Sequence, residues 1–159
     1  AFNMKTHNIL SIDKFKSIIR RNSRLMGIDP GEKNIGISIC DENQIVATPF
    51  KTLRKTTLES LLIEINHIIS ENKIMGVVVG NPINMDGSIG KSSQSASDFC
   101  KNLSKNITIP ITMWDERLSS EASFKFARKI GKNTSANLKN LDMNAAAFIL
   151  QGAIDYLGN

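Results

Sequence analysis

The sequence of 159 residues contains only two cysteines, Cys40 and Cys100, and no apolar run approaching the roughly 20 residues that a membrane-spanning helix needs. Two thiols make neither a disulfide framework nor a cysteine-rich metal site, so we expect both to be reduced core residues, as in a cytoplasmic protein. We expect neither a secretory signal nor a membrane partner. We expect residues 1–3, which precede Met4, to be an addition to the natural chain.

Charge and hydrophobicity indicate one basic globular domain. The chain is 41% hydrophobic, carries a formal net charge of +5 at pH 7 and has a pI near 9.3. Its length suits a single domain with a sizeable core. The positive charge favours an anionic partner such as nucleic acid or an acidic surface.

Residues 1–23 are predicted to form a basic arm in front of the main domain, which we assign to residues 24–159. Behind Ser11, a residue suited to cap a helix, apolar residues recur at helical spacing, and several arginines follow. The arm is either a helix docked on the domain with a solvated basic end or a segment that contacts phosphates. We favour the docked helix, because charge runs are usually solvated.

The main domain is predicted to be of the α/β class. Short apolar segments predict strands over residues 24–29, 35–41, 44–53, 74–80 and 109–114, and periodic apolar residues predict helices over 57–72, 92–105, from Ser119 or Ser120 to Ile130, and from about Leu141 onward. The first three strands form a meander in which Pro49 indicates an edge or a bulge. Segment 74–80 is apolar on both faces, which is typical of a central parallel strand. This order predicts a mixed five-stranded sheet with helices on both faces.

Several carboxylates stand where the fold alone would not place a charge. Asp29 follows an apolar strand, Asp115 and Glu116 follow the fifth strand, and Asp142 continues the apolar stripe of the last helix. Each has an ordinary explanation: Asp29 could bond turn amides, Asp142 could cap its helix, and Asp115 or Glu116 could pair with Arg117. Since neighbours on a strand alternate faces, only one of Asp115 and Glu116 can face a common site.

Taken together, these acids predict a metal site. Like charges gathered at the end of a sheet repel one another unless a cation joins them. Oxygen ligands without His or Cys select a hard ion, so Mg²⁺ or Mn²⁺ is expected. Two such ions about 4 Å apart can activate a water molecule and stabilise the leaving oxygen of a phosphodiester.

Four motifs in a fixed order resemble those of the YqgF/RuvX family, over about residues 24–157. They are GIDPG at 27–31 with NIG at 34–36, VGNPINMDGS at 79–88, DERLSS at 115–120, and Asp142 with AAAFILQ at 145–151. The resemblance implies a ribonuclease H-like fold. It also implies a nuclease that resolves Holliday junctions or matures the 5′ end of pre-16S ribosomal RNA, with Asp29, Glu116 and Asp142 as its catalytic metal ligands.

The residues near these acids suggest how a substrate would be held. We expect Asn81, Asn84 and Ser88 to orient the phosphate or a water molecule, and Lys33 and Arg117 to contact phosphates. Related resolvases have an acid directly after the central strand, where this chain has Asn81, so the metal site could be incomplete without substrate.

The leading interpretation is therefore a metal-dependent endonuclease that acts on an rRNA precursor or on branched DNA. A non-catalytic nucleic-acid-binding protein of the same fold is the alternative. An actin-like ATPase also opens with an Asp-Gly turn between two strands, but it needs a second domain for which 159 residues leave no room. Symmetric junction resolution needs a dimer, and the sequence is compatible with a monomer or a homodimer.

Overall fold

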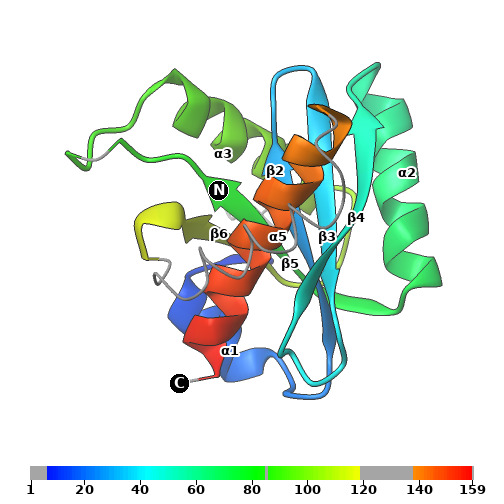
Figure 1. The fold of residues 1–159 in the computed structure, drawn as a ribbon, viewed down its shortest axis with the longest axis vertical. Coiled ribbons are helices and arrows are strands. Elements are labelled where there is room, and N and C mark those ends of the chain that lie inside the picture. Colours follow the sequence, from blue (N-terminus) through cyan, green and yellow to red (C-terminus); the bar gives the residue numbers. More distant parts are fainter. Residues whose placement is uncertain (1–6, 85, 119–137, 159) are drawn as a thin grey trace.

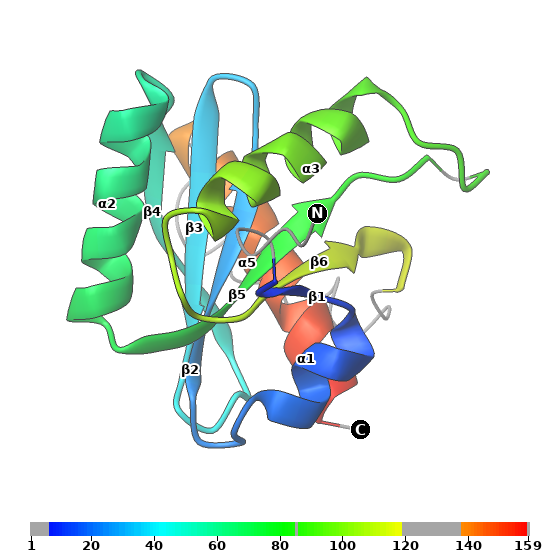
Figure 2. The ribbon, with the colours of Figure 1, turned by 180° about the vertical axis from the view of Figure 1, so that it is seen from behind.

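A mixed sheet with helices on both faces forms the frame of the molecule. The computed structural model describes residues 7–84, 86–118 and 138–158, with side chains from Asn144 onward in the last range. Six strands follow the order β1-β6-β5-β2-β3-β4. Helices α2 (Leu58–Glu71) and α3 (Lys91–Ser104) cover one face, seen in Figure 2, and α5 (Leu138–Leu157) covers the other, seen in Figure 1. Helix α1 (Ile12–Ile18) shares an apolar cluster with α5.

The strands confirm the predicted meander and central strand. Strands β2 (Arg24–Pro30), β3 (Asn34–Cys40) and β4 (Ala47–Arg54) are antiparallel neighbours, while β5 (Ile74–Asn81) lies parallel to both β2 and β6 (Ile111–Asp115). Strand β4 is an edge strand whose register with β3 shifts between Ile37 and Ser38, opposite Lys51 and Pro49. Proline lacks the N–H group that a regular ladder needs, which explains the irregularity at this position.

The predicted count of five strands is wrong, because the N-terminal segment adds a sixth. Strand β1 (Ile9–Leu10) pairs in parallel with β6, and the Ile111 N–H donates to the Asn8 carbonyl at 2.8 Å. A strand of two residues is too short to show an alternating pattern, and its partner lies about a hundred residues further along the chain. Directly after it, α1 is capped by the Ser11 hydroxyl, as predicted, and its Phe15 is fully buried.

Two apolar clusters hold the layers together. One lies under α2 and α3, and the other joins α5 and α1 to the opposite face of the sheet. The last helix begins at Leu138, three residues before the predicted start, and the helix predicted from Ser119 or Ser120 to Ile130 lies outside the described residues. No helix in the described part of the chain is both long and apolar enough to span a membrane.

Candidate active site

The carboxyl ends of the parallel strands β2, β5 and β6 lie along one edge of the sheet. The ladder pairs Ile28 with Val79, and Asn81 with Asp115, so these strands end at nearly the same level. Sheets of this kind bind ligands beyond the carboxyl ends of their strands. The first and third of the predicted motifs therefore meet at this edge.

Asp29 lies near the end of β2, where it is half-buried. The register with β3 is regular from Met26 to Pro30. Leu25 belongs to the cluster under α5, and a Cβ on Gly27 would meet Leu150 of α5. Alternation along the strand places Asp29 on this same face.

Glu116 approaches the same edge from the end of β6. It is the first residue of the 3₁₀ helix η2 (Glu116–Leu118) and is half-buried. Its carboxylate oxygen Oε1 lies 3.2 Å from the point where a Cβ on Gly80 would stand, and the Ile149 side chain of α5 borders that point too. The missing side chain at Gly80 thus leaves room for the carboxylate on the α5 face.

The pKa of Glu116 is raised by its surroundings at this edge of the sheet. Burial raises the pKa of Glu116, and the negative charges of Asp29 and Asp115 raise it further. Two carboxylates that repel each other in this way provide the oxygen donors and the negative potential that a hard divalent cation needs. The structure therefore brings Asp29 and Glu116 together.

Arg117 compensates the negative charge of Asp115. The Asp115 Oδ1 accepts the backbone N–H and the Nε–H of Arg117, each at 3.0 Å, and its Oδ2 accepts Nη2–H of Arg117 at 2.7 Å. The hydrogen bonds from Arg117 lower the pKa of Asp115. Pairing with Arg117, one of the ordinary explanations considered for the acids, thus applies to Asp115.

Asn81 faces away from the acidic pair. Gly80 faces α5, so its neighbour Asn81 faces α3, where its Oδ1 accepts the Ser93 hydroxyl at 2.6 Å. Asn81 was predicted to orient the substrate, but the structure does not bring its side chain to Asp29 and Glu116.

Asn84 and Ser88 belong to the exposed loop between β5 and α3. The Asn84 side-chain amide donates to the Ser88 hydroxyl at 3.0 Å, and the Ser88 backbone N–H donates to the Asp86 carboxylate at 2.9 Å. Hydrogen bonds from Ser88 lower the pKa of Asp86. Arg117 lies against this loop, since its Nη1 is 3.6 Å from where a Cβ on Gly87 would be. These residues form a second group beside the acids.

The remaining predicted residues are Asp142 and Lys33. The side chain of Asp142 lies outside the described part of the chain, so its role as a third ligand stays a prediction. Among the described side chains, which exclude Asp142, no three His, Cys, Asp or Glu residues gather to form a metal site. Lys33 is exposed at the turn between β2 and β3.

Two lysines that the sequence did not single out border Asp29. A hollow of about 350 Å³ is lined by Asp29, Lys55 and Lys91, together with residues of the β2–β3 turn, of the loop after β5 and of α3. Lys55 directly follows the edge strand β4 and Lys91 begins α3. The sequence shows that each lysine lies next to the end of a predicted strand or helix. It does not show that the end of β4 and the start of α3 both lie beside Asp29.

The sequence is similar to those of proteins named as nucleases. A profile of the family described as "RuvX: Holliday junction resolvase" matches residues 23–156. A "Putative pre-16S rRNA nuclease" of Pelagibacter ubique is 50% identical over 151 residues, which cover 95% of this chain and 100% of the relative. A protein of Rhodobacter capsulatus with the same name is 38% identical, with 93% of each chain covered.

Solved structures give the same fold at low sequence identity. The chain is similar to T. thermophilus RuvC in complex with Holliday junction substrate, with a TM-score of 0.58, 12% identity, and coverage of 84% of this chain and 94% of that one. The yeast mitochondrial Holliday junction resolvase Ydc2 matches with a TM-score of 0.55 and 12% identity, covering 92% of this chain and 84% of that one. These matches confirm the ribonuclease H-like fold. The family profile and the relative that is half identical along its whole length show that this chain belongs to the RuvX family.

Proposed function

We propose that this protein is a metal-dependent endonuclease that hydrolyses a phosphodiester bond in a structured nucleic acid. The observation that carries the proposal is that Asp29 and Glu116 lie on the α5 face at the carboxyl edge of neighbouring strands, where the charge of Asp29 contributes to the raised pKa of Glu116. Membership of the RuvX family supports a nuclease, and the name shared by its relatives favours the precursor of 16S rRNA as the substrate.

Asp29, Glu116 and Asp142 would hold Mg²⁺ or Mn²⁺. The first two offer oxygen donors only, and the space left by Gly80 admits the carboxylate of Glu116, so the residues fit a hard cation. Such an ion, when bound, lowers the pKa of a water molecule and offsets the charge of the leaving oxygen. The protein's own part is to hold these carboxylates on one face of the sheet.

The surrounding polar residues would place the nucleic acid. Arg117 uses Nε and Nη2 on Asp115, which leaves Nη1 to donate to a phosphate beside the loop of Asn84 and Ser88. Lys33 would contact a phosphate from the β2–β3 turn. Asn81 would act on the substrate only through Ser93 and the start of α3. We assign the activity to the cytoplasm, where the two free buried cysteines would stay reduced.

The test is cleavage by the parent and by Asp29→Asn. The purified protein is incubated with Mn²⁺ and either a 5′-extended 16S rRNA fragment or a four-way DNA junction, with EDTA as the metal-free control. We expect the parent to cut the RNA at a defined site, and Asp29→Asn to lose this activity while its circular dichroism spectrum is unchanged. Preferred cutting of the junction would make branched DNA the substrate. Binding of either probe without any cleavage would favour the non-catalytic alternative.

A further inference from the structure

A basic cleft lies beside the turn between β2 and β3. It has a volume of about 660 Å³ and is lined by Glu32, Lys33, Asn34, Thr52, Arg54 and Lys55. The side chains of Lys33, Arg54 and Lys55 are exposed, and within the described part of the chain none of the three forms an ion pair. Three uncompensated cations against one carboxylate give this cleft a positive potential. We refer to it below as the Lys33–Arg54–Lys55 cleft.

Paired backbone carries the three basic residues of the cleft. Arg54 stands opposite Asn34 in the β3–β4 ladder, and the Lys55 N–H extends the ladder by donating to the Lys33 carbonyl at 2.9 Å. The turn before them is tight, since a Cβ on Gly31 would come within 2.5 Å of the Asn34 carbonyl oxygen. The three basic residues therefore stand at or next to the paired ends of β3 and β4, which sets the spacing of their backbone positions.

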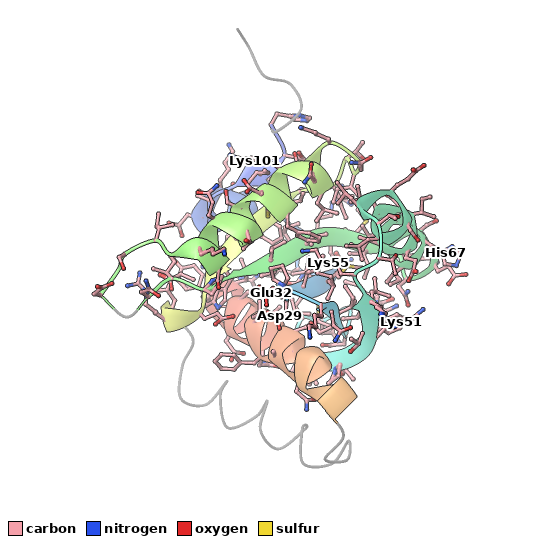
Figure 3. The ribbon with its side chains drawn as sticks, turned by 90° about the horizontal axis from the view of Figure 1, so that it is seen from above. Asp29, Glu32, Lys51, Lys55, His67 and Lys101 are labelled. Atoms are coloured by element: carbon pink, nitrogen blue, oxygen red, sulfur yellow. The ribbon has the colours of Figure 1, made fainter. Side chains whose placement is uncertain are left out.

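The cleft is continuous with the hollow that contains Asp29. Glu32 and Lys55 line both spaces, and Lys91 lines the hollow on its α3 side. Figure 3 shows Asp29, Glu32 and Lys55 grouped together at this edge of the molecule, with Lys101 well away from them on α3. A chain that passes Asp29 can thus continue past Lys55 into the cleft.

We propose that the Lys33–Arg54–Lys55 cleft binds backbone phosphates of the nucleic-acid strand that flanks the scissile bond. This inference rests on the proposed function. It adds where the substrate strand would lie on one side of the active site. The six residues that line the cleft in the described structure include no aromatic ring on which a base could stack, whereas they offer ammonium, guanidinium, amide and hydroxyl donors. The cleft is therefore expected to bind phosphates without base-sequence specificity. Glu32 lies between the two spaces and opposes the passage of a phosphate.

The proposal is tested by the salt dependence of binding. A fluorescent single-stranded RNA of twelve nucleotides is titrated with protein in EDTA at several KCl concentrations, and affinity is measured by anisotropy. Each phosphate contact with a single strand contributes a slope of about 0.7 in log affinity against log salt, so Lys33→Gln/Arg54→Gln/Lys55→Gln should lower the slope by about 2. Lys14→Gln/Lys101→Gln/Lys105→Gln removes three exposed cations from α1, α3 and the residue after α3. Both triple variants change the net charge from +5 to +2 (5 minus 3), so the control should keep the parent slope.

A variant that removes a negative charge, and should therefore strengthen binding, makes the test stricter. Glu32→Gln removes the carboxylate shared by the two spaces, so it should bind the RNA more tightly than the parent does. An equal loss of slope in both triple variants, weaker binding by Glu32→Gln, or no binding by the parent would each overturn the proposal. Thermal melts show whether the variants fold, and Lys55→Gln alone, with an expected slope change of about 0.7, serves if the triple variant does not.

The outcomes separate this inference from the proposed nuclease. A parent that cleaves in Mn²⁺, while the cleft variant keeps the parent's salt slope, rejects the cleft and leaves the nuclease. A parent that binds through the cleft but cuts neither substrate rejects the nuclease and leaves the cleft as a nucleic-acid-binding surface.

Discussion

Asp115 and Glu116 are adjacent in the chain but differ in what surrounds them. Asp115 ends β6, and three hydrogen-bond donors of Arg117 lower its pKa. Glu116 begins η2 and turns toward Gly80, where burial and the charge of Asp29 raise its pKa. Arg117 compensates the charge of Asp115, whereas no described side chain forms an ion pair with Glu116. Of the two, Glu116 is therefore the residue suited to bind a cation.

Glu116→Gln should stabilise the metal-free protein at neutral pH more than at acidic pH. An acid whose pKa is raised on folding contributes stability that is present below its ordinary value of 4.5 and is lost as the pH rises through the folded value. The amide does not titrate, so the gain in free energy of unfolding should grow as the pH rises through this window. Urea melts in EDTA at pH 4 and pH 7.5 measure it, with the exposed Glu42→Gln as control. A gain that is the same at both pH values would contradict the crowding of acids at this edge.

At the scale of elements, the site depends on how closely α5 approaches the sheet. A Cβ on Gly27 would lie 2.7 Å from the Leu150 Cβ and 2.8 Å from the Ala146 carbonyl oxygen. The Ser38 hydroxyl of β3 donates to that same carbonyl at 2.7 Å. Glycine at position 27 thus lets α5 lie against β2, which brings the helix that carries Asp142 to the face of the sheet that carries Asp29.

Gly27→Ala should destabilise the fold by about 1–3 kcal/mol, the usual cost of overpacking a core. Gly158→Ala is the matched control, because a Cβ there would meet no atom closer than 3.4 Å. The control should change the free energy of unfolding by less than about 0.5 kcal/mol. Urea denaturation at pH 7 compares the two. Equal effects would mean that α5 can move away from β2 without cost.

Apolar periodicity predicts those elements that bury a continuous face. Strands β2 and β5 and helix α2 differ from their predicted bounds by one residue at each end at most. The sequence could not predict β1 or the Lys33–Arg54–Lys55 cleft, because both depend on pairing between segments that are distant or unpatterned. The sequence also could not predict which face of the sheet Asn81 lies on. Strand β5 is apolar on both faces, so the alternation of its residues does not show which face packs against which helix.

At the scale of the whole molecule, the N-terminal segment is packed into the fold. Asn8 is buried, and its side-chain amide donates to the Ile107 and Ile109 carbonyls at 3.1 and 3.0 Å. Phe15 of α1 is fully buried in the cluster under α5, and the Tyr156 hydroxyl of α5 donates to Asp13 at 2.8 Å. The docked helix that we favoured for this segment is therefore present, and it packs against α5.

Phe15→Ala should cost about 3–5 kcal/mol of stability, as truncation of a fully buried phenylalanine does. Ile18→Ala on the same helix is the control, because Ile18 is 47% exposed and loses little burial. The free energy of unfolding from urea melts gives both values. If the two variants were equally stable, α1 would contribute nothing to the core, and its role would have to lie in binding a partner.

We propose that the acids on the α5 face, and not Asp115, form the nuclease centre. The most direct test of this proposal is the single-turnover cleavage rate in Mn²⁺ of Glu116→Gln and Asp115→Asn, each compared with the parent on the substrate that the parent cuts. We predict that Glu116→Gln falls to the rate seen in EDTA while remaining folded. Asp115→Asn should lose on the order of 1 kcal/mol of stability, the usual scale of weakened hydrogen bonds, and keep most of its activity. Full activity in Glu116→Gln together with loss in Asp115→Asn would contradict this account and move the metal ligand to Asp115.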